Sequence, residues 1–303
     1  MIFSFLKLLI FFITRPLALY RIYPGAIALM MAGPIQEAEL AEQDLLEKGG
    51  VSVSLVTEDN RQIEGMYFSV KDSLPEATKK FSDETRPTVL FCLGNTMFYQ
   101  LYWEHYEFYL KEGYNVMVFN YGGYRNSEGS PTAQRTYADV ESAYQFIKKN
   151  KGTADSRILV HGLSLGGGPS TYLASKYPVH LVLDRTYSRL GDVSENPALA
   201  GLANFMYPYD NIARIKELKG RIHLIEASND RMMYPKHVTE LFEEIVRIRH
   251  PEASPEEKES LRLQYVTTVP GSHSACVLLN NPGFDIPRNN FVEQVISPMG
   301  KAS

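Results

Sequence analysis

The sequence predicts an α/β domain with a mostly parallel central sheet, helices on both faces, and an antiparallel hairpin at its N-terminal edge. Short apolar runs such as 88–93 and 157–161 do not alternate with polar residues, which is typical of strands buried on both faces. Longer segments of helical character separate these runs, and strands that alternate with helices form parallel sheets. Residues 51–57 and 62–70 instead flank a polar turn at 58–60, which indicates the hairpin.

Local signals place the remaining elements. Residues 71–87 are mostly polar, contain two prolines and are expected to form a loop. Ser130-Pro131 offers an N-cap and a first-turn proline for a helix that runs to about residue 149. Ser254-Pro255-Glu256-Glu257 has the capping-box pattern of a short surface helix. The other expected strands are 115–120, 181–183, 221–226 and 263–269, and the other expected helices are 98–112, the segment after residue 166, 235–249 and 291–296.

Length and composition describe one globular domain with an extension. The chain has 303 residues, 44% hydrophobic and 22% charged side chains, and a net charge of −4. This charge balance does not indicate nucleic-acid binding. Cys92 and Cys276 are too few for a disulfide framework or a cysteine zinc site, and no metal or organic cofactor is implied. We divide the chain into an apolar, basic N-terminal extension at 1–45 and an α/β domain at 50–300.

The extension is a candidate membrane-interface segment. Residues 1–34 hold Lys7, Arg15 and Arg21 but no acidic residue, and no apolar run reaches the ~18 residues that a spanning helix needs. On a helix the three basic side chains would share one side, which favours a segment that lies in or anchors to a membrane interface. An apolar arm packed on its own domain is a second interpretation, and a cleaved signal peptide is a third. We therefore expect a membrane-associated protein, and otherwise a cytoplasmic one.

Residues 157–168 carry the strongest chemical signal in the chain. An apolar run leads into Gly162-Leu163-Ser164-Leu165-Gly166, and a helix-like segment follows. A serine on a tight strand-to-helix turn needs glycine two residues to each side, because a Cβ there would clash with neighbouring backbone. Such a turn presents the Ser164 hydroxyl to a substrate, and the helix N-terminus offers N–H groups where an oxyanion would form. A glycine-rich helix start that only packs closely is the alternative. A phosphate-binding loop is disfavoured because no Gly-Lys-Ser/Thr follows.

Residues that could activate this serine follow two later strands. A serine hydroxyl needs a base within hydrogen-bond reach, and the base needs a carboxylate that fixes its tautomer. Asp230 comes soon after one expected strand, and His273 comes directly after the last one. Because sites in parallel α/β sheets lie at the carboxyl ends of the strands, both should meet Ser164 at one edge. Asp184 also follows a strand and is a rival for the acid, and Asp230 and His273 could each be an ordinary loop residue.

Besides residues 157–168, two other stretches of the sequence are distinctive. They are 115–131, with its Tyr-Gly-Gly-Tyr-Arg-Asn-Ser-Glu-Gly-Ser-Pro run, and 181–187, which reads Leu-Val-Leu-Asp-Arg-Thr-Tyr. Together these stretches resemble the α/β-hydrolase superfamily over roughly residues 50–300. They are closest to its abhydrolase-domain branch, with its membrane-linked lipases and acyl-protein thioesterases. The resemblance implies the α/β-hydrolase fold, and the short segment between residue 184 and residue 221 indicates a small lid or none.

The resemblance implies a Ser-Asp-His triad. Ser164 would be the nucleophile, Asp230 the orienting acid and His273 the general base. The expected function is a serine hydrolase that cleaves a carboxylic ester or thioester, on a fatty-acyl lipid or an acylated protein, through an acyl-enzyme. A peptidase or an acyltransferase on the same fold, or a hydrolase-fold binding module that has lost catalysis, remains open. The expected partners are the acyl substrate and a membrane surface reached through residues 1–34, and the oligomeric state is not indicated.

The oxyanion donors and the acyl pocket are also predicted near the triad. The family often has His-Gly-Asn after its third strand, where this chain has Leu-Gly-Asn-Thr. A backbone donor survives a side-chain change, so we expect the N–H groups of Leu165 and Asn95 to form the oxyanion hole, with Thr96 as the next candidate. Phe98 and Tyr99 are expected to line the acyl pocket.

Overall fold

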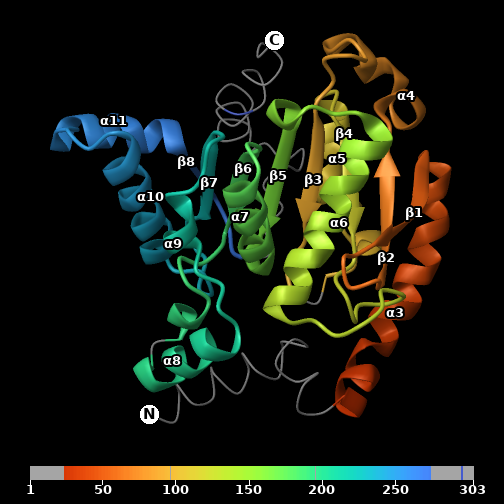
Figure 1. Ribbon diagram of the computed structural model, residues 1–303, viewed down its shortest axis with the longest axis horizontal. Coiled ribbons are helices and arrows are strands. Elements are labelled where there is room, and N and C mark those ends of the chain that lie inside the picture. The colour runs from red at the N-terminus through yellow and green to blue at the C-terminus, as the bar shows by residue number, and fades with distance from the viewer. Residues whose placement is uncertain (1–23, 96, 195, 274–294, 296–303) are drawn as a thin grey trace.

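An eight-stranded sheet forms the centre of the fold (Figure 1). The computed structural model describes residues 24–95, 97–194, 196–273 and 295. The strand order is β1-β2-β4-β3-β5-β6-β7-β8. β1 (Gly50–Val56) pairs antiparallel with β2 (Gln62–Phe68), β2 pairs antiparallel with β4 (Asn115–Phe119), and all later neighbours are parallel. The prediction of a mostly parallel sheet with an antiparallel edge hairpin is therefore confirmed.

The remaining strands are followed, at their carboxyl ends, by the loops that hold the predicted site residues. They are β3 (Thr88–Cys92), β5 (Ile158–Leu163), β6 (His180–Asp184), β7 (Ile222–Ala227) and β8 (Val266–Val269). Because β3, β5, β6, β7 and β8 are parallel, the loops that follow them leave the sheet at the same edge. In Figure 1 this edge faces downward, on the side where the N-terminal end of α3 (Pro24–Glu47) and α8 (Pro197–Met206) lie.

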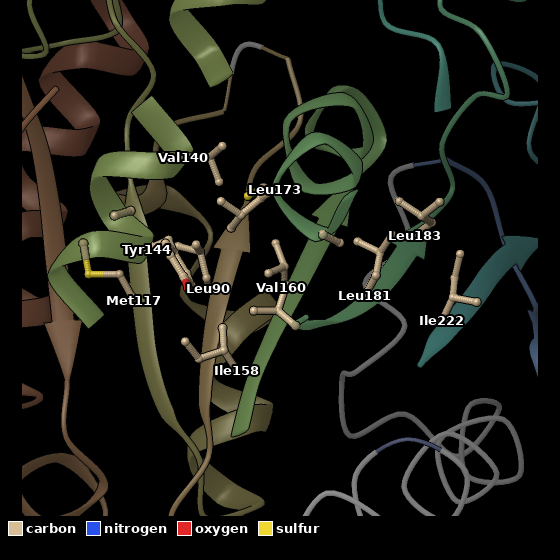
Figure 2. Packing of buried hydrophobic residues seen from close by; sticks show 14 of the residues in the cluster. Leu90, Met117, Val140, Tyr144, Ile158, Val160, Leu173, Leu181, Leu183 and Ile222 are labelled. Carbon is tan, nitrogen blue, oxygen red and sulfur yellow. The ribbon is translucent and has the colours of Figure 1, made fainter. Parts of the chain in front are cut away.

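Helices bury both faces of the sheet. Alternate residues of one strand enter different cores: Leu90 packs on one face, and Val89 and Phe91 pack on the other. The first core is closed by α6 (Ala133–Lys151), α7 (Gly167–Lys176) and α10 (Pro235–Arg249), and the second is closed by α5 (Trp103–Lys111). Figure 2 shows side chains of the first core converging from the strands and from α6 and α7. The remaining short elements are α4 (Val70–Ser73), α9 (Asn211–Ile215), α11 (Pro255–Tyr265) and the 3₁₀ turns η1 (Pro75–Lys80), η2 (Tyr99–Leu101), η3 (Asp155–Arg157), η4 (Ser164–Gly166) and η5 (Gly191–Val193).

The second half of α3 packs on the domain. Ala38 and Leu45 are buried, and Glu42 forms an ion pair with Arg125 in the loop after β4. Among the described residues, no helix combines the length and the apolar composition needed to cross a membrane. Most of the predicted membrane-interface segment lies outside the described residues, so its membrane contact stays a prediction.

Several expected elements differ in their boundaries, and three of them change in a way that has a local explanation. Residues 71–87 are not a continuous loop, because α4 and η1 lie within 70–80. The expected helix 98–112 is split at Tyr102, where the preceding turn is held by a hydrogen bond from Tyr99 N to the side chain of Asn120. The N-cap of α6 is Thr132, which accepts a bond from Arg135 N, whereas the Ser130 hydroxyl accepts from the Arg135 side chain.

The last strand is shorter than predicted. The capping box of Ser254 and Glu257 is confirmed, and it starts a helix that continues to Tyr265. β8 therefore begins at Val266. The expected helix at 291–296 lies outside the described residues, apart from Val295.

Candidate active site

Ser164 sits on a sharp turn between β5 and α7. β5 ends at Leu163, η4 forms the turn, and α7 starts at Gly167. Ser164 adopts a φ of 52°, in the left-handed region that non-glycine residues rarely occupy. This backbone costs on the order of 1–2 kcal/mol and persists because the surrounding structure holds it. Strain of this kind marks a position where the direction of a side chain is constrained.

The glycines of the motif are required by close backbone approach. A Cβ on Gly162 would stand 2.7 Å from the backbone oxygen of Gly166, and a Cβ on Gly166 would stand 2.1 Å from the backbone oxygen of Cys92. The predicted clash is therefore confirmed at both positions. The next residue, Gly167, is also constrained, since its Cβ would lie 2.1 Å from Thr186 Oγ1. The tight turn that carries Ser164 therefore depends on the close packing of these three glycines.

The structure brings Ser164, His273 and Asp230 into one chain of hydrogen bonds. His273 Nε2 lies 2.9 Å from Ser164 Oγ, and His273 Nδ1 lies 2.8 Å from Asp230 Oδ2. Asp230 Oδ1 accepts from the backbone N–H groups of Met232 and Met233, both at 2.8 Å. Asp230 is only 5% exposed, so these two donors and the imidazole fix the orientation of its carboxylate. This arrangement suits proton transfer from the hydroxyl to the imidazole.

Asp184, the rival acid, faces different partners. Its carboxylate binds the guanidinium of Arg185 and lies 3.3 Å from His161 Nε2. Burial raises the pKa of Asp184, but the charge of Arg185 and the hydrogen bond to His161 outweigh it and hold the pKa below its usual range. Asp230 is therefore the carboxylate that contacts the His273 ring.

The loop after β3 lies against the turn that carries Ser164. A Cβ on Gly94 would stand 3.4 Å from Ser164 Cβ, and the next residue, Asn95, accepts a 2.9 Å hydrogen bond from Tyr124 through its side-chain oxygen. On the other side of the serine, the Leu165 carbonyl accepts a 3.0 Å bond from Tyr187. The roles of the Leu165 and Asn95 N–H groups stay predictions, and Thr96 lies outside the described residues.

Phe98 and Tyr99 belong to the hydrophobic cores. Both side chains are 1% exposed, Phe98 in the core shared with α6 and α7 and Tyr99 in the core closed by α5. Tyr99 is further tied down, since its carbonyl accepts a 2.9 Å bond from the hydroxyl of Tyr106. Their contact with an acyl chain stays a prediction, and it would require these side chains to move.

Sequence reasoning missed the residues that tie the site together after β6. Thr186 Oγ1 donates a 2.6 Å hydrogen bond to the Ser164 carbonyl, and Arg185 Nη1 donates a 3.0 Å bond to the His273 carbonyl. The one available signal was a run of polar side chains directly after a buried strand at the carboxyl edge of the sheet. In the part of the chain that the structure describes, no group of three or more His, Cys, Asp or Glu side chains could hold a metal ion.

Comparisons with known proteins agree on the fold. No family model matches the chain. It is 26% identical over 146 residues to human alpha/beta hydrolase domain-containing protein 17B, covering 45% of this chain and 47% of that protein. The chain thus spans about half the length of the curated relatives it matches.

Solved structures cover more of the chain. An esterase from Pyrococcus furiosus superposes with a TM-score of 0.58 at 18% identity, over 82% of this chain and 91% of that one. A puromycin-hydrolyzing peptidase from Mycobacterium tuberculosis gives a TM-score of 0.57 at 14% identity, over 81% of this chain and 38% of that one. The chain has the α/β-hydrolase fold, and the predicted resemblance to that superfamily is confirmed.

Proposed function

We propose that this protein is a serine hydrolase that cleaves a carboxylic ester or thioester through Ser164, His273 and Asp230. The fold and the relatives support hydrolase activity in general. The observation that carries the finer proposal is the relay in which one imidazole contacts the Ser164 hydroxyl at 2.9 Å and the Asp230 carboxylate at 2.8 Å. A hydroxyl, an imidazole and a buried carboxylate in this order are the components of nucleophilic acyl transfer.

In this proposal His273 first accepts the proton of Ser164 and then donates it to the leaving group. Asp230 accepts a hydrogen bond from Nδ1–H of His273, which leaves Nε2 unprotonated and facing the hydroxyl. As Ser164 Oγ attacks the acyl carbon, Nε2 takes its proton, and the nearby carboxylate stabilises the imidazolium that forms. His273 then gives the proton to the leaving alcohol or thiol, and an acyl-enzyme remains. Water attacks this ester with the same imidazole as base, which releases the acid and restores the serine.

The oxyanion of each tetrahedral intermediate needs donors beside the serine. We place it against the N–H groups of Leu165 and Asn95, at the N-terminus of the helical segment that follows Ser164 and in the loop after β3. The close approach of Gly94 to Ser164 supports this position, because it brings the loop against the serine side chain. Losing one such donor typically costs about 10²–10³ in kcat.

Two features support an acyl ester or thioester as the substrate. The apolar, basic segment at 1–34 suits contact with a lipid surface, where fatty-acyl groups are found. Among its described residues, the segment between β6 and β7 forms the short elements η5, α8 and α9, which supports access of a bulky lipid or an acylated protein to the serine. The substrate class we propose is a fatty acyl chain linked to an alcohol or thiol leaving group.

Covalent labelling tests the proposal. A fluorophosphonate should label the purified full-length protein, and Ser164→Ala should abolish the labelling because the attacking oxygen is gone. Ser175→Ala is the matched control: it lies on α7, and its hydroxyl bonds to Tyr172 O within the helix, so labelling should be unchanged. A folded wild-type protein that is not labelled would favour the binding module.

A substrate panel tests the leaving group. Acyl esters and acyl thioesters of increasing chain length should be hydrolysed faster than aminoacyl amides. A preference for the amides would favour the peptidase. Formation of a new ester when an alcohol acceptor is added would identify an acyltransferase.

A further inference from the structure

The segment 184–187 contacts the backbone of both Ser164 and His273, two members of the proposed catalytic relay. Thr186 Oγ1 donates a 2.6 Å hydrogen bond to the backbone oxygen of Ser164, and Tyr187 donates a 3.0 Å bond to the backbone oxygen of Leu165. These bonds hold the turn that carries the serine. The residue before them, Arg185, reaches the other side of the site. One short segment after β6 therefore joins the loop of the nucleophile to the loop of the base.

Arg185 binds the backbone at His273. Its Nη1 donates a 3.0 Å hydrogen bond to the His273 carbonyl, and its side chain is 1% exposed. The other side of the guanidinium is paired with Asp184, with Nε at 2.6 Å from Oδ1 and Nη2 at 2.9 Å from Oδ2. This two-point contact fixes the plane of the guanidinium and so the direction of Nη1.

The carboxylate in this pair is itself held in place. Asp184 Oδ2 lies 3.3 Å from His161 Nε2, and His161 Nδ1 lies 2.6 Å from the hydroxyl of Tyr109 on α5. All four of these side chains are buried, so the chain of contacts runs through the domain core to the His273 carbonyl. A buried ion pair needs such partners, because its desolvation is offset only when its remaining polar atoms are satisfied.

The backbone of Arg185 is constrained as well. Arg185 has a φ of 46°, in the left-handed region, and its N–H donates a 2.7 Å bond to the carbonyl of Ile225 on β7. A non-glycine residue in this region costs free energy, so the surrounding contacts must over-determine it. The strained backbone turns the side chain back toward the end of β8, where His273 lies.

We propose that Arg185 is a positioning residue for His273, an inference that rests on the proposed function. The imidazole must keep its place while its Nε2 contact changes from the Ser164 hydroxyl to the leaving group, and Asp230 orients only the ring, through Nδ1. The bond from Arg185 holds the backbone of His273 and is independent of the protonation state of the ring. A misplacement of about 1 Å at a reacting group can cost about a hundredfold in rate.

The test compares two buried arginines. Arg185→Lys keeps a positive charge beside Asp184 but loses the fork that binds the carboxylate and the His273 carbonyl together. The matched control is Arg86→Lys. Arg86 is also buried, and it donates bonds of 2.9 Å to the carbonyls of Gly113 and Phe81.

The readouts are the rate constant for fluorophosphonate labelling, kcat and KM for an acyl ester, and the thermal midpoint. Arg185→Lys should lower kcat and the labelling rate constant about 10- to 100-fold and change KM less than about threefold. Arg86→Lys should lower the thermal midpoint about as much as Arg185→Lys does. Its kcat and its labelling rate constant should stay within about twofold of wild type. The double variant Asp184→Asn/Arg185→Gln removes both charges together, and it should show the same fall in kcat.

The outcomes separate the two proposals. If the wild type is not labelled, the proposed function fails and this inference fails with it. If the wild type is labelled and Ser164→Ala is not, a wild-type kcat in folded Arg185→Lys or in the double variant would overturn the inference alone. An equal fall of kcat in Arg86→Lys, or an effect confined to KM, would also overturn it.

Discussion

The backbone oxygen of Cys92 occupies the space that a Cβ on Gly166 would need, at 2.1 Å. In the parallel pairing of β3 and β5, Cys92 lies opposite Gly162, so both glycines of the motif face the end of β3. The loop after β3 therefore starts in contact with the turn of Ser164. This contact accompanies the close approach of Gly94 to Ser164.

Gly166→Ala should destabilise the protein. The added methyl group meets backbone rather than a flexible side chain, so we expect a loss of about 2 kcal/mol in the free energy of unfolding. Gly201→Ala on α8 is the control, because no described atom lies within 4 Å of its Cβ apart from the helix itself. It should stabilise by about 0.5–1 kcal/mol. Urea unfolding measures both, and similar values for the two variants would contradict the packing argument.

Ser164→Gly should give a more stable protein than Ser164→Ala. Both substitutions remove the hydroxyl and its bond to His273, but only glycine relieves the left-handed φ of 52°. The difference in free energy of unfolding should be about 1 kcal/mol in favour of glycine. Equal thermal midpoints would show that the turn is not strained in solution.

Asp230→Asn should lower kcat about a thousandfold or more with little change in fold. An amide nitrogen at the place of Oδ2 cannot accept from Nδ1–H, so the imidazole would lose the tautomer that the reaction needs. Asp192→Asn is the control, since Asp192 pairs with Arg189 at 3.5 Å in the segment between β6 and β7. Ester hydrolysis and circular dichroism measure the two effects. A wild-type kcat in Asp230→Asn would remove Asp230 from the proposed triad.

Stability should fall as the pH is lowered from about 6.5 to about 4, in part through His223. Burial lowers the pKa of His223 to about 4 from its ordinary 6.5, and its Nε2 lies 2.8 Å from Thr267 Oγ1. Between these pH values the unfolded chain binds a proton that the native chain does not. Lowering the pH therefore stabilises the unfolded state relative to the native state. The loss in free energy of unfolding that His223 contributes approaches about 1.4 kcal/mol per pH unit.

His223→Gln removes this titration and keeps a polar group beside Thr267. The difference in free energy of unfolding between wild type and variant should change with pH across this window and be constant above about pH 7. A difference that is independent of pH would contradict the assignment.

Binding of the full-length chain to vesicles tests the N-terminal segment. The chain should bind vesicles that contain phosphatidylglycerol, and the triple variant Lys7→Glu, Arg15→Glu, Arg21→Glu should bind at least about tenfold more weakly, because each basic residue near an anionic surface contributes about 1 kcal/mol. Pure phosphatidylcholine vesicles should reduce the difference. Equal binding of both proteins to both kinds of vesicle would contradict an electrostatic contact between the N-terminal segment and the membrane.

Local chemistry in the sequence was sufficient for most elements. The uninterrupted apolar runs predicted β3, β5 and β6, and the capping box predicted the start of α11. The same logic failed where a distant partner decided the backbone. The helix expected at 98–112 is interrupted at Tyr102, and the turn before the interruption is bonded to Asn120, which lies on a different part of the chain.

The sequence by itself determined the α/β architecture and the turn at Ser164, because buried strands, glycines and caps act over a few neighbouring residues. Only the tertiary structure decided that Asp230, and not Asp184, contacts the ring of His273. Both carboxylates follow a buried strand, and spacing along the chain cannot separate them. The difference is that the guanidinium of Arg185 forms an ion pair with Asp184. The left-handed backbone of Arg185 and its hydrogen bond to β7 direct the guanidinium to that position. Such contacts join residues far apart in sequence, so they exist only once the sheet has assembled.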